Sequence, residues 1–355
     1  MKRYGIAFMM LCILAVLALG GCTLTEGFKY TGTKSSTEVM DLTGVNEVRF
    51  HLGAEDVEIV SQDGSEATFI IKKTWRANDK EYGEELLDEA KITIERDGER
   101  LVIKREGSTI RDGWDMITKG YVSIDITAML PEDLALNIST GSGDIDLDDR
   151  TAPVDISTGS GDVVAAHMDG GLDMTTGSGD LHLTGVKGLL KFSSGSGDVS
   201  VTEAAGRAEI STGSGDVEID RAGGDVKVST GSGDIDVGTL EGDLHARASS
   251  GDVMVLDHNG EADIETSSGD VALRTGSGEG VVNIDTSSGD VDIVVYNVDS
   301  VEVDLMTSTG VMRTKIPLVV EDASRRRLLG RAGRGDLKIA VSTTSGDISV
   351  RQGSV

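Results

Sequence analysis

Apolar and polar residues alternate along the middle of the chain, and the alternation returns every eighteen residues from Thr140 to Asp270. Each repeat contains an aspartate, then an apolar residue, a mixed position and a second apolar residue. The first apolar column reads Ile145, Val163, Leu181, Val199, Val217, Ile235, Val253 and Val271. This alternation predicts a short strand with one face buried and the other in water.

A second apolar pair precedes each aspartate, and its later member reads Ile156, Met174, Phe192, Ile210, Val228, Ala246 and Ile264. Every repeat therefore holds two short strands joined by two corners. The sequence Thr-Gly-Ser-Gly-Asp, or a close variant, marks one corner, and a glycine series that begins at Gly170 marks the other. We expect glycine at both corners because it reaches a positive φ without a Cβ clash.

A constant short period indicates similar units that stack and contact only their neighbours. Two strands per unit can form two facing sheets about 10 Å apart, with a rise of about 4.8 Å per rung. The sequence thus predicts an all-β fold, a β-solenoid with 18-residue rungs of two short strands each. The pattern leaves the handedness of the coil open.

The repeat weakens toward both ends. Residues 53–56 resemble a degenerate corner, so we expect the stack to begin near Val45. Residues 61–120 predict a cap, with a strand at 69–71, a short helix around 84–90 and a hairpin over 92–103 that turns at Asp97-Gly98. The corner sequence returns at Ser345 after an interruption. The expected divisions are a signal peptide at 1–21, a lipid-anchored tether at 22–44, a β-rich cap with the first degenerate rung at 45–135, and the solenoid at 136–350.

The first 22 residues differ in kind from the rest. Lys2 and Arg3 precede an apolar run from Ile6 to Leu19, and two glycines follow before Cys22. This arrangement resembles a bacterial lipoprotein signal peptide, and the run is short for a membrane span. We expect lipidation of Cys22 and an extracytoplasmic protein that a lipid anchors to a bacterial membrane, either plasma or outer membrane. A plain signal peptide and an N-terminal anchor helix are the alternatives.

The chain is strongly acidic, with a formal net charge of -28 at pH 7. A charge of this sign excludes nucleic acid as a partner of the body and favours cations or basic partners. Five arginines form a local exception where the repeat is interrupted: Arg325, Arg326, Arg327, Arg331 and Arg334. We interpret them as a solvated loop, with contact to an anionic polymer or lipid headgroup as the alternative.

The corner aspartates are candidate metal ligands: Asp144, Asp162, Asp180, Asp198, Asp216, Asp234, Asp252 and Asp270. Neighbouring carboxylates about 4.8 Å apart repel by roughly 1 kcal/mol even in water, so something must offset the repulsion. Calcium along the column would do so, and so would hydrogen bonds from backbone N–H groups of each aspartate's own turn. We favour the hydrogen bonds, and we expect no other cofactor.

The sequence offers no convergent catalytic site, because a corner that recurs many times is structural whereas an active site occurs once. The histidines share no column of the repeat: His51, His167, His182, His245 and His258. We therefore expect that the protein is not an enzyme. Outward carboxylates keep a polysaccharide-processing enzyme as an alternative: Asp146, Asp155, Asp173, Glu218, Asp220 and Asp236.

The Ser-Gly-Asp-Ile/Val corners, the segment 124–131 and the closing segment 344–348 together resemble a bacterial family over residues 45–350. That family is the "putative adhesin" group of β-strand-repeat domains of unknown function. The resemblance implies a secreted or lipid-anchored β-repeat protein. Our leading hypothesis is a non-enzymatic, lipid-anchored cell-envelope protein, an adhesin-like binding or scaffold module for an unknown envelope protein or surface polymer. The alternative is an accessory lipoprotein of an envelope-stress or signalling system.

Overall fold

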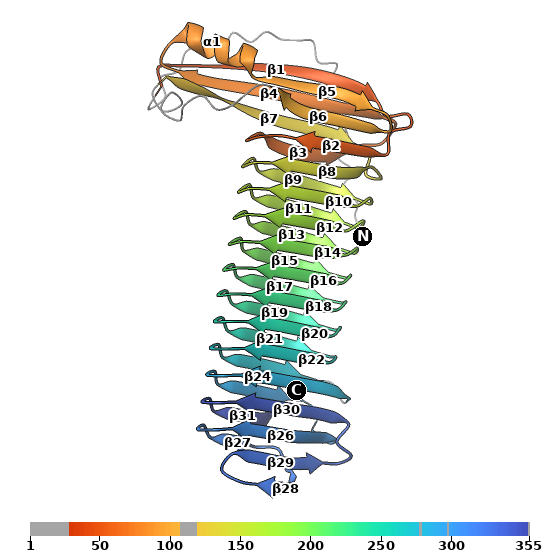
Figure 1. The fold of residues 1–355 in the computed structure, drawn as a ribbon. Coiled ribbons are helices and arrows are strands. Elements are labelled where there is room, and N and C mark those ends of the chain that lie inside the picture. Colours follow the sequence, from red (N-terminus) through yellow and green to blue (C-terminus); the bar gives the residue numbers. More distant parts are fainter. Residues whose placement is uncertain (1–27, 107–118, 277–278, 297, 354–355) are drawn as a thin grey trace.

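The computed structural model describes residues 28–106, 119–276, 279–296 and 298–353. In this part the chain is almost entirely β-structure, and its strands form two long sheets of 15 and 16 strands, called here the first and the second sheet. The two sheets run along an elongated stack (Figure 1). The structure confirms the predicted β-solenoid, in which each rung supplies one strand to each sheet.

The regular strands of the first sheet are β9 (Ile145–Arg150), β11 (Val163–Met168), β13 (Leu181–Val186), β15 (Val199–Ala204), β17 (Val217–Ala222), β19 (Ile235–Leu240), β21 (Val253–His258), β23 (Val271–Thr275) and β25 (Val291–Val295). Those of the second sheet are β8 (Ala135–Thr140), β10 (Val154–Thr158), β12 (Leu172–Thr176), β14 (Leu190–Ser194), β16 (Ala208–Thr212), β18 (Val226–Thr230), β20 (Leu244–Ala248), β22 (Ala262–Thr266) and β24 (Gly280–Thr286). Neighbours pair in parallel, with Val163 opposite both Ile145 and Leu181. The columns that the sequence predicts are therefore real columns in space.

The core is a narrow layer of aliphatic side chains between the two sheets, because alternate residues of each strand point inward. Three polar side chains interrupt an inward column of the first sheet: Arg150, His258 and Thr275 are all fully buried. Arg150 Nη2 donates to the carbonyl oxygens of Pro131 and Leu134, each at 2.8 Å. Burial lowers the pKa of Arg150 to about 10, and burial also lowers the pKa of His258.

Each Thr-Gly-Ser-Gly-Asp corner is closed by its buried threonine. The N–H of Gly215 donates to Thr212 Oγ1 at 3.0 Å, and the Thr212 hydroxyl donates to the carbonyl oxygen of Gly197 in the preceding rung at 3.1 Å. The same pair of bonds forms at Thr230. The threonine therefore stabilises its own turn and also links it to the turn of the preceding rung.

The prediction that the corner glycines are needed for a positive φ was wrong. The glycines of the Thr-Gly-Ser-Gly-Asp corners lie outside the left-handed region, and so does Gly170 of the other series. At that other corner the left-handed residue is the next one, Gly171, with a φ of +93°. The physical reason for glycine is close approach between rungs. A Cβ on Gly161 would collide with the carbonyl oxygen of Gly143, and one on Gly215 would collide with that of Gly197.

The N-terminal cap contains β1 (Tyr30–Asp41), β2 (Glu47–His51), β3 (Asp56–Ser61), β4 (Glu66–Ala77), α1 (Lys80–Glu89), β5 (Lys91–Asp97), β6 (Arg100–Glu106) and β7 (Gly120–Leu130). The predicted strand, helix and hairpin correspond to β4, α1 and the antiparallel pair β5–β6. β2 and β3 pair in parallel with β8 and β9, as a first rung should. The only helix of the described residues is neither long nor apolar enough to cross a membrane.

The prediction of a polar tether over 22–44 was wrong from Tyr30 onward. Those residues form β1, which pairs with β4 along its entire length, from Tyr30 opposite Ala77 to Asp41 opposite Glu66. The polar composition of β1 suits an edge strand that is largely exposed, and for this reason its sequence looks like a linker.

The C-terminal strands are β26 (Val301–Thr307), β27 (Met312–Thr314), β28 (Val319–Ala323), β29 (Arg327–Ala332), β30 (Leu337–Thr343) and β31 (Ile348–Gln352). They do not stack in chain order. β30 lies between β24 and β26, and β31 lies between β25 and β27, all in parallel. The last rung of the chain is thus inserted inside the stack, and the antiparallel pair β28–β29 covers the end of the second sheet (Figure 1).

Candidate functional site

The corner aspartates form a continuous ladder along one edge of the stack, but the predicted hydrogen bonds within each turn were misplaced. Each carboxylate instead accepts from the backbone N–H of the corresponding aspartate in the following rung. Asp198 Oδ1 accepts from the N–H of Asp216 at 2.8 Å, and Asp216 Oδ1 accepts from that of Asp234 at 2.8 Å. The same bond recurs from Asp144 to Asp290. These bonds offset the repulsion between neighbouring carboxylates and give the ladder a structural role.

The five arginines of the interruption lie at the C-terminal end of the stack, around β29. Arg327 makes two bonds of 2.8 Å to the carboxylate of Asp304. Arg331 lies 3.5 Å from Glu321, and Arg334 lies 3.0 Å from Asp336. Arg325 and Arg326 are exposed. The cluster is thus neither one loop nor one basic patch, since three of its members are paired with carboxylates.

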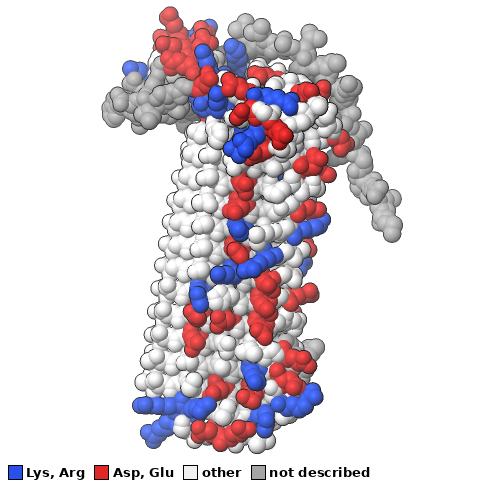
Figure 2. All heavy atoms as spheres, turned by 45° about the vertical axis from the view of Figure 1, so that its right-hand side comes forward, with Lys and Arg blue, Asp and Glu red and all other residues white. Residues whose placement is uncertain are grey.

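The outward carboxylates that could imitate a polysaccharide-processing site lie on different faces. Asp155 and Asp173 belong to the second sheet, whereas Asp146, Glu218 and Asp236 belong to the first. Burial and the neighbouring Asp173 raise the pKa of Asp155. Acidic and basic side chains are interspersed along one side of the stack (Figure 2). The structure thus divides these carboxylates between the two sheets, with Asp155 opposite Asp173 on one and Glu218 opposite Asp236 on the other.

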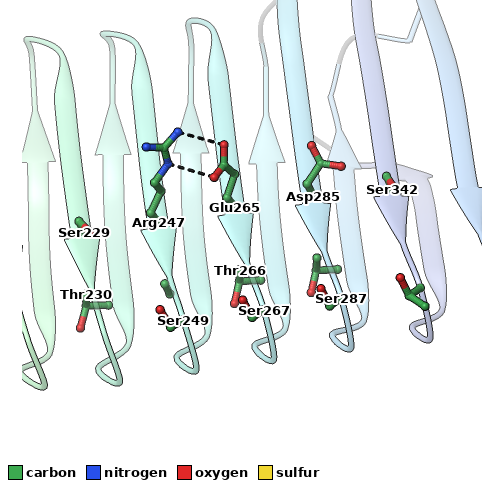
Figure 3. A pocket seen from close by; sticks show the side chains of 13 residues that line it. Ser229, Thr230, Arg247, Ser249, Glu265, Thr266, Ser267, Asp285, Ser287 and Ser342 are labelled. Atoms are coloured by element: carbon green, nitrogen blue, oxygen red, sulfur yellow. Dashed lines mark hydrogen bonds and ion pairs between the residues drawn. The ribbon is translucent and has the colours of Figure 1, made fainter.

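The outer face of the second sheet carries a polar groove that sequence reasoning missed. It is shallow and open, holds about 550 Å³, and extends from β18 to β30. Figure 3 shows Ser229, Arg247, Glu265, Asp285 and Ser342 projecting from successive strands of this face. The parallel register places these residues in one column, because Arg247 lies opposite both Ser229 and Glu265.

The charges of this groove are partly neutralised by pairing. Arg247 binds the carboxylate of Glu265 on the neighbouring strand, with Nε to Oε2 at 3.0 Å and Nη2 to Oε1 at 3.1 Å. Asp285 follows in the same column. A second row of hydroxyls, including Ser249, Ser267 and Ser287, lines the groove at the corners (Figure 3). The groove therefore presents many hydrogen-bond donors and acceptors.

A second groove, lined by both polar and apolar residues, lies across the other end of the same strands. It holds about 480 Å³, and its lining includes Lys227, His245 and Asp263. His245 Nδ1 lies 2.9 Å from Asp263 Oδ2. Both grooves thus lie on the outer face of the second sheet, one at each end of its strands. In the sequence, the residues of both grooves occupy outward positions of the strand that each repeat contributes to the second sheet. Because their residue types differ from repeat to repeat, the sequence did not indicate a common site.

Such a stack of parallel rungs, with serines along the outer face of one sheet, defines an extended β-solenoid. The chain belongs to the Toastrack DUF4097 family, whose model matches residues 45–275 and 244–351. No curated protein matches the chain.

Several solved structures are similar to the chain. A "putative adhesin" from Bacteroides fragilis is 13% identical, with 89% of this chain and 97% of that chain covered and a TM-score of 0.29. A "putative lipid binding protein" from Parabacteroides distasonis is 14% identical, with 90% and 97% covered and a TM-score of 0.27. A "putative cell adhesion protein" from Clostridium sporogenes is 11% identical, with 91% and 100% covered and a TM-score of 0.19.

Proposed function

We propose that this chain is a non-enzymatic, lipid-anchored protein of the bacterial envelope, and that the outer face of its second sheet binds a hydroxyl-rich surface polymer. The observation that carries the proposal is the groove between β18 and β30, where serine hydroxyls, a neutralised ion pair and a carboxylate lie together on the outer face of the sheet. Hydroxyl groups of a polysaccharide can donate to the carboxylates and accept from the serines and the arginine.

The chemistry of the groove favours a neutral glycan over other polymers. The net charge of -28 opposes an anionic polymer along the body of the stack. The groove is lined almost entirely by serine, threonine and charged residues, so it offers little apolar area to a lipid chain. Its length across successive strands suits an extended ligand that contacts several rungs.

The anchor is the second part of the proposal. Cys22 lies outside the described residues, so its support is the sequence alone, in which an apolar run and two glycines precede the cysteine. A lipid on Cys22 would attach the chain next to the cap and leave the regular rungs and their groove free to meet other surface components.

The anchor is tested by labelling cells with a palmitate analogue and comparing the wild type with Cys22→Ser. We expect the label and membrane association in the wild type and loss of both in the variant. Membrane association of Cys22→Ser equal to that of the wild type would contradict the anchor.

The binding function is tested by crosslinking in intact cells followed by an array of neutral and anionic bacterial polysaccharides. We expect recovery of a polysaccharide and binding to neutral members of the array. Recovery of one membrane protein without any polysaccharide would contradict the proposal and favour a signalling accessory. Release of shortened products from an array polymer would show an enzyme instead.

A further inference from the structure

Two of the first regular rungs each hold one residue, an aspartate and a histidine, in the left-handed backbone conformation. Asp149 and His167 have φ values of 52° and 55°, and Gly185, the next residue of this column, has a φ of 89°. Asp149 and His167 lie outside the ladder register of β9 and β11. This gap in the pairing has closed by β15 and β17, where Glu203 pairs with Arg221.

In this conformation the imidazole of one rung lies against two carboxylates of the neighbouring rung. His167 Nδ1 lies 2.9 Å from Asp148 Oδ1 and 3.2 Å from Asp149 Oδ1. The ligand atoms of these three residues all lie within 4.8 Å of one another. Two donors that each bind a tetrahedral ion at about 2.0 Å are about 3.3 Å apart, so the observed separations are close to those a single ion requires.

A hollow of about 430 Å³ beside the cluster leaves space for further ligands of an ion. Its lining includes Asp149, His167, Asp169 and Lys187. Lys187 is the cationic side chain that would most directly oppose a metal there, and its ammonium is paired with Asp169 at 2.7 Å. The two carboxylates of the cluster would balance the charge of a divalent ion.

We propose that Asp148, Asp149 and His167 bind a divalent transition-metal ion, for which Zn²⁺ fits best, through one imidazole nitrogen and two carboxylate oxygens. The imidazole distinguishes this cluster from the all-carboxylate corner ladder, because calcium and magnesium prefer oxygen ligands whereas zinc accepts nitrogen and oxygen together. Three protein ligands leave a fourth position for water or for a group from a partner. This site is independent of the polymer groove, which lies on the other sheet.

The test is titration calorimetry of the full chain, purified without a histidine tag, with zinc chloride and with calcium chloride. We expect one equivalent of Zn²⁺ to bind and a melting temperature that rises with Zn²⁺. His167→Asn removes the imidazole, and asparagine tolerates the left-handed conformation, so the fold should persist. We expect this variant to lose about tenfold or more in zinc affinity, with a similar loss for Asp149→Asn.

His182→Asn is the matched control, because His182 is an exposed histidine of the next strand, β13, outside the cluster. We expect it to bind zinc like the wild type. Absence of zinc binding by the wild type would overturn the proposal. Equal affinity in the wild type and His167→Asn would also overturn it, since the zinc would then bind elsewhere. Circular dichroism of each variant checks that a loss of binding is not a loss of fold.

Discussion

At Gly215 the missing side chain allows two successive corners to stack. A Cβ there would collide with the carbonyl oxygen of Gly197, so Gly215→Ala must push two rungs apart. We expect a loss of about 1–3 kcal/mol in the free energy of unfolding, measured by urea denaturation.

Gly223→Ala is the control for this substitution. The nearest atom to a Cβ at Gly223 is the carbonyl oxygen of Ala205 at 3.7 Å, an ordinary contact. We expect a change within about 0.5 kcal/mol. Equal effects of the two substitutions would contradict close approach as the reason for glycine at the corner.

Asp216 stabilises the ladder through its hydrogen-bond acceptor and not through its negative charge. Asparagine keeps the oxygen that accepts from the N–H of Asp234 and removes one of three adjacent negative charges. We expect Asp216→Asn to be at least as stable as the wild type, and Asp216→Ala to lose about 1 kcal/mol. Melting curves of both variants and the wild type, recorded with EDTA and with calcium, measure these stabilities. A loss in Asp216→Asn that appears only with calcium would show that the column binds a cation.

His258 links stability to pH through its burial. It is fully buried and lies in register with Leu240, and burial lowers its pKa. As the pH falls below about 6.5, the unfolded chain takes up a proton that the folded chain does not, so stability declines. We expect the wild type to lose more melting temperature between pH 7.5 and pH 5 than His258→Leu does. Equal losses in the two proteins would contradict this account.

Among the elements, the C-terminal rung is the one whose position in the stack could not be predicted from the sequence. The returning corner at Ser345 predicts a rung, but its place in the stack does not follow from the pattern. Val301, Val303 and Leu305 of β26 have the same apolar spacing as the inward residues of β30, and both sets are buried. Either strand could therefore pair with β24. Non-local pairing decided the order, and a column of residue types contains no information about that choice.

Truncation after Asp336 tests the inserted rung. It removes β30 and β31, the parallel partners of β26 and β27. We expect β26–β29 to lose protection in hydrogen–deuterium exchange, while β8–β23 keep it, because rungs contact only their neighbours. Truncation after Gln352 is the control and should change neither region. Retained protection in β26–β29 of the shorter protein would mean that they restack directly on β24 and β25.

For the molecule as a whole, the eighteen-residue period predicts the two sheets, their register and the buried columns, because each follows from strand alternation alone. The functional surface depends on less regular positions. Arg247, Glu265 and Asp285 share one column with serines, so the residue type changes along the column. Likewise His167 contacts Asp148 where His167 and Asp149 adopt the left-handed backbone conformation. The eighteen-residue spacing continues through these residues, so the sequence contains no signal for that conformation. The positions whose residue type repeats every eighteen residues form the stack, and the outward positions whose residue type varies determine the chemistry of its surface.

The central claim is that the corners maintain the stack while the second sheet binds the ligand. Its most direct test compares binding to the array of neutral and anionic bacterial polysaccharides for the wild type, Gly215→Ala and the double variant Arg247→Ser with Glu265→Ser. The double variant removes both partners of an exposed pair, so its stability should change little.

We predict that the double variant keeps its melting temperature and loses binding, whereas Gly215→Ala melts earlier and still binds at a temperature where it is folded. Undiminished binding by the double variant, or loss of binding by folded Gly215→Ala, would contradict the account.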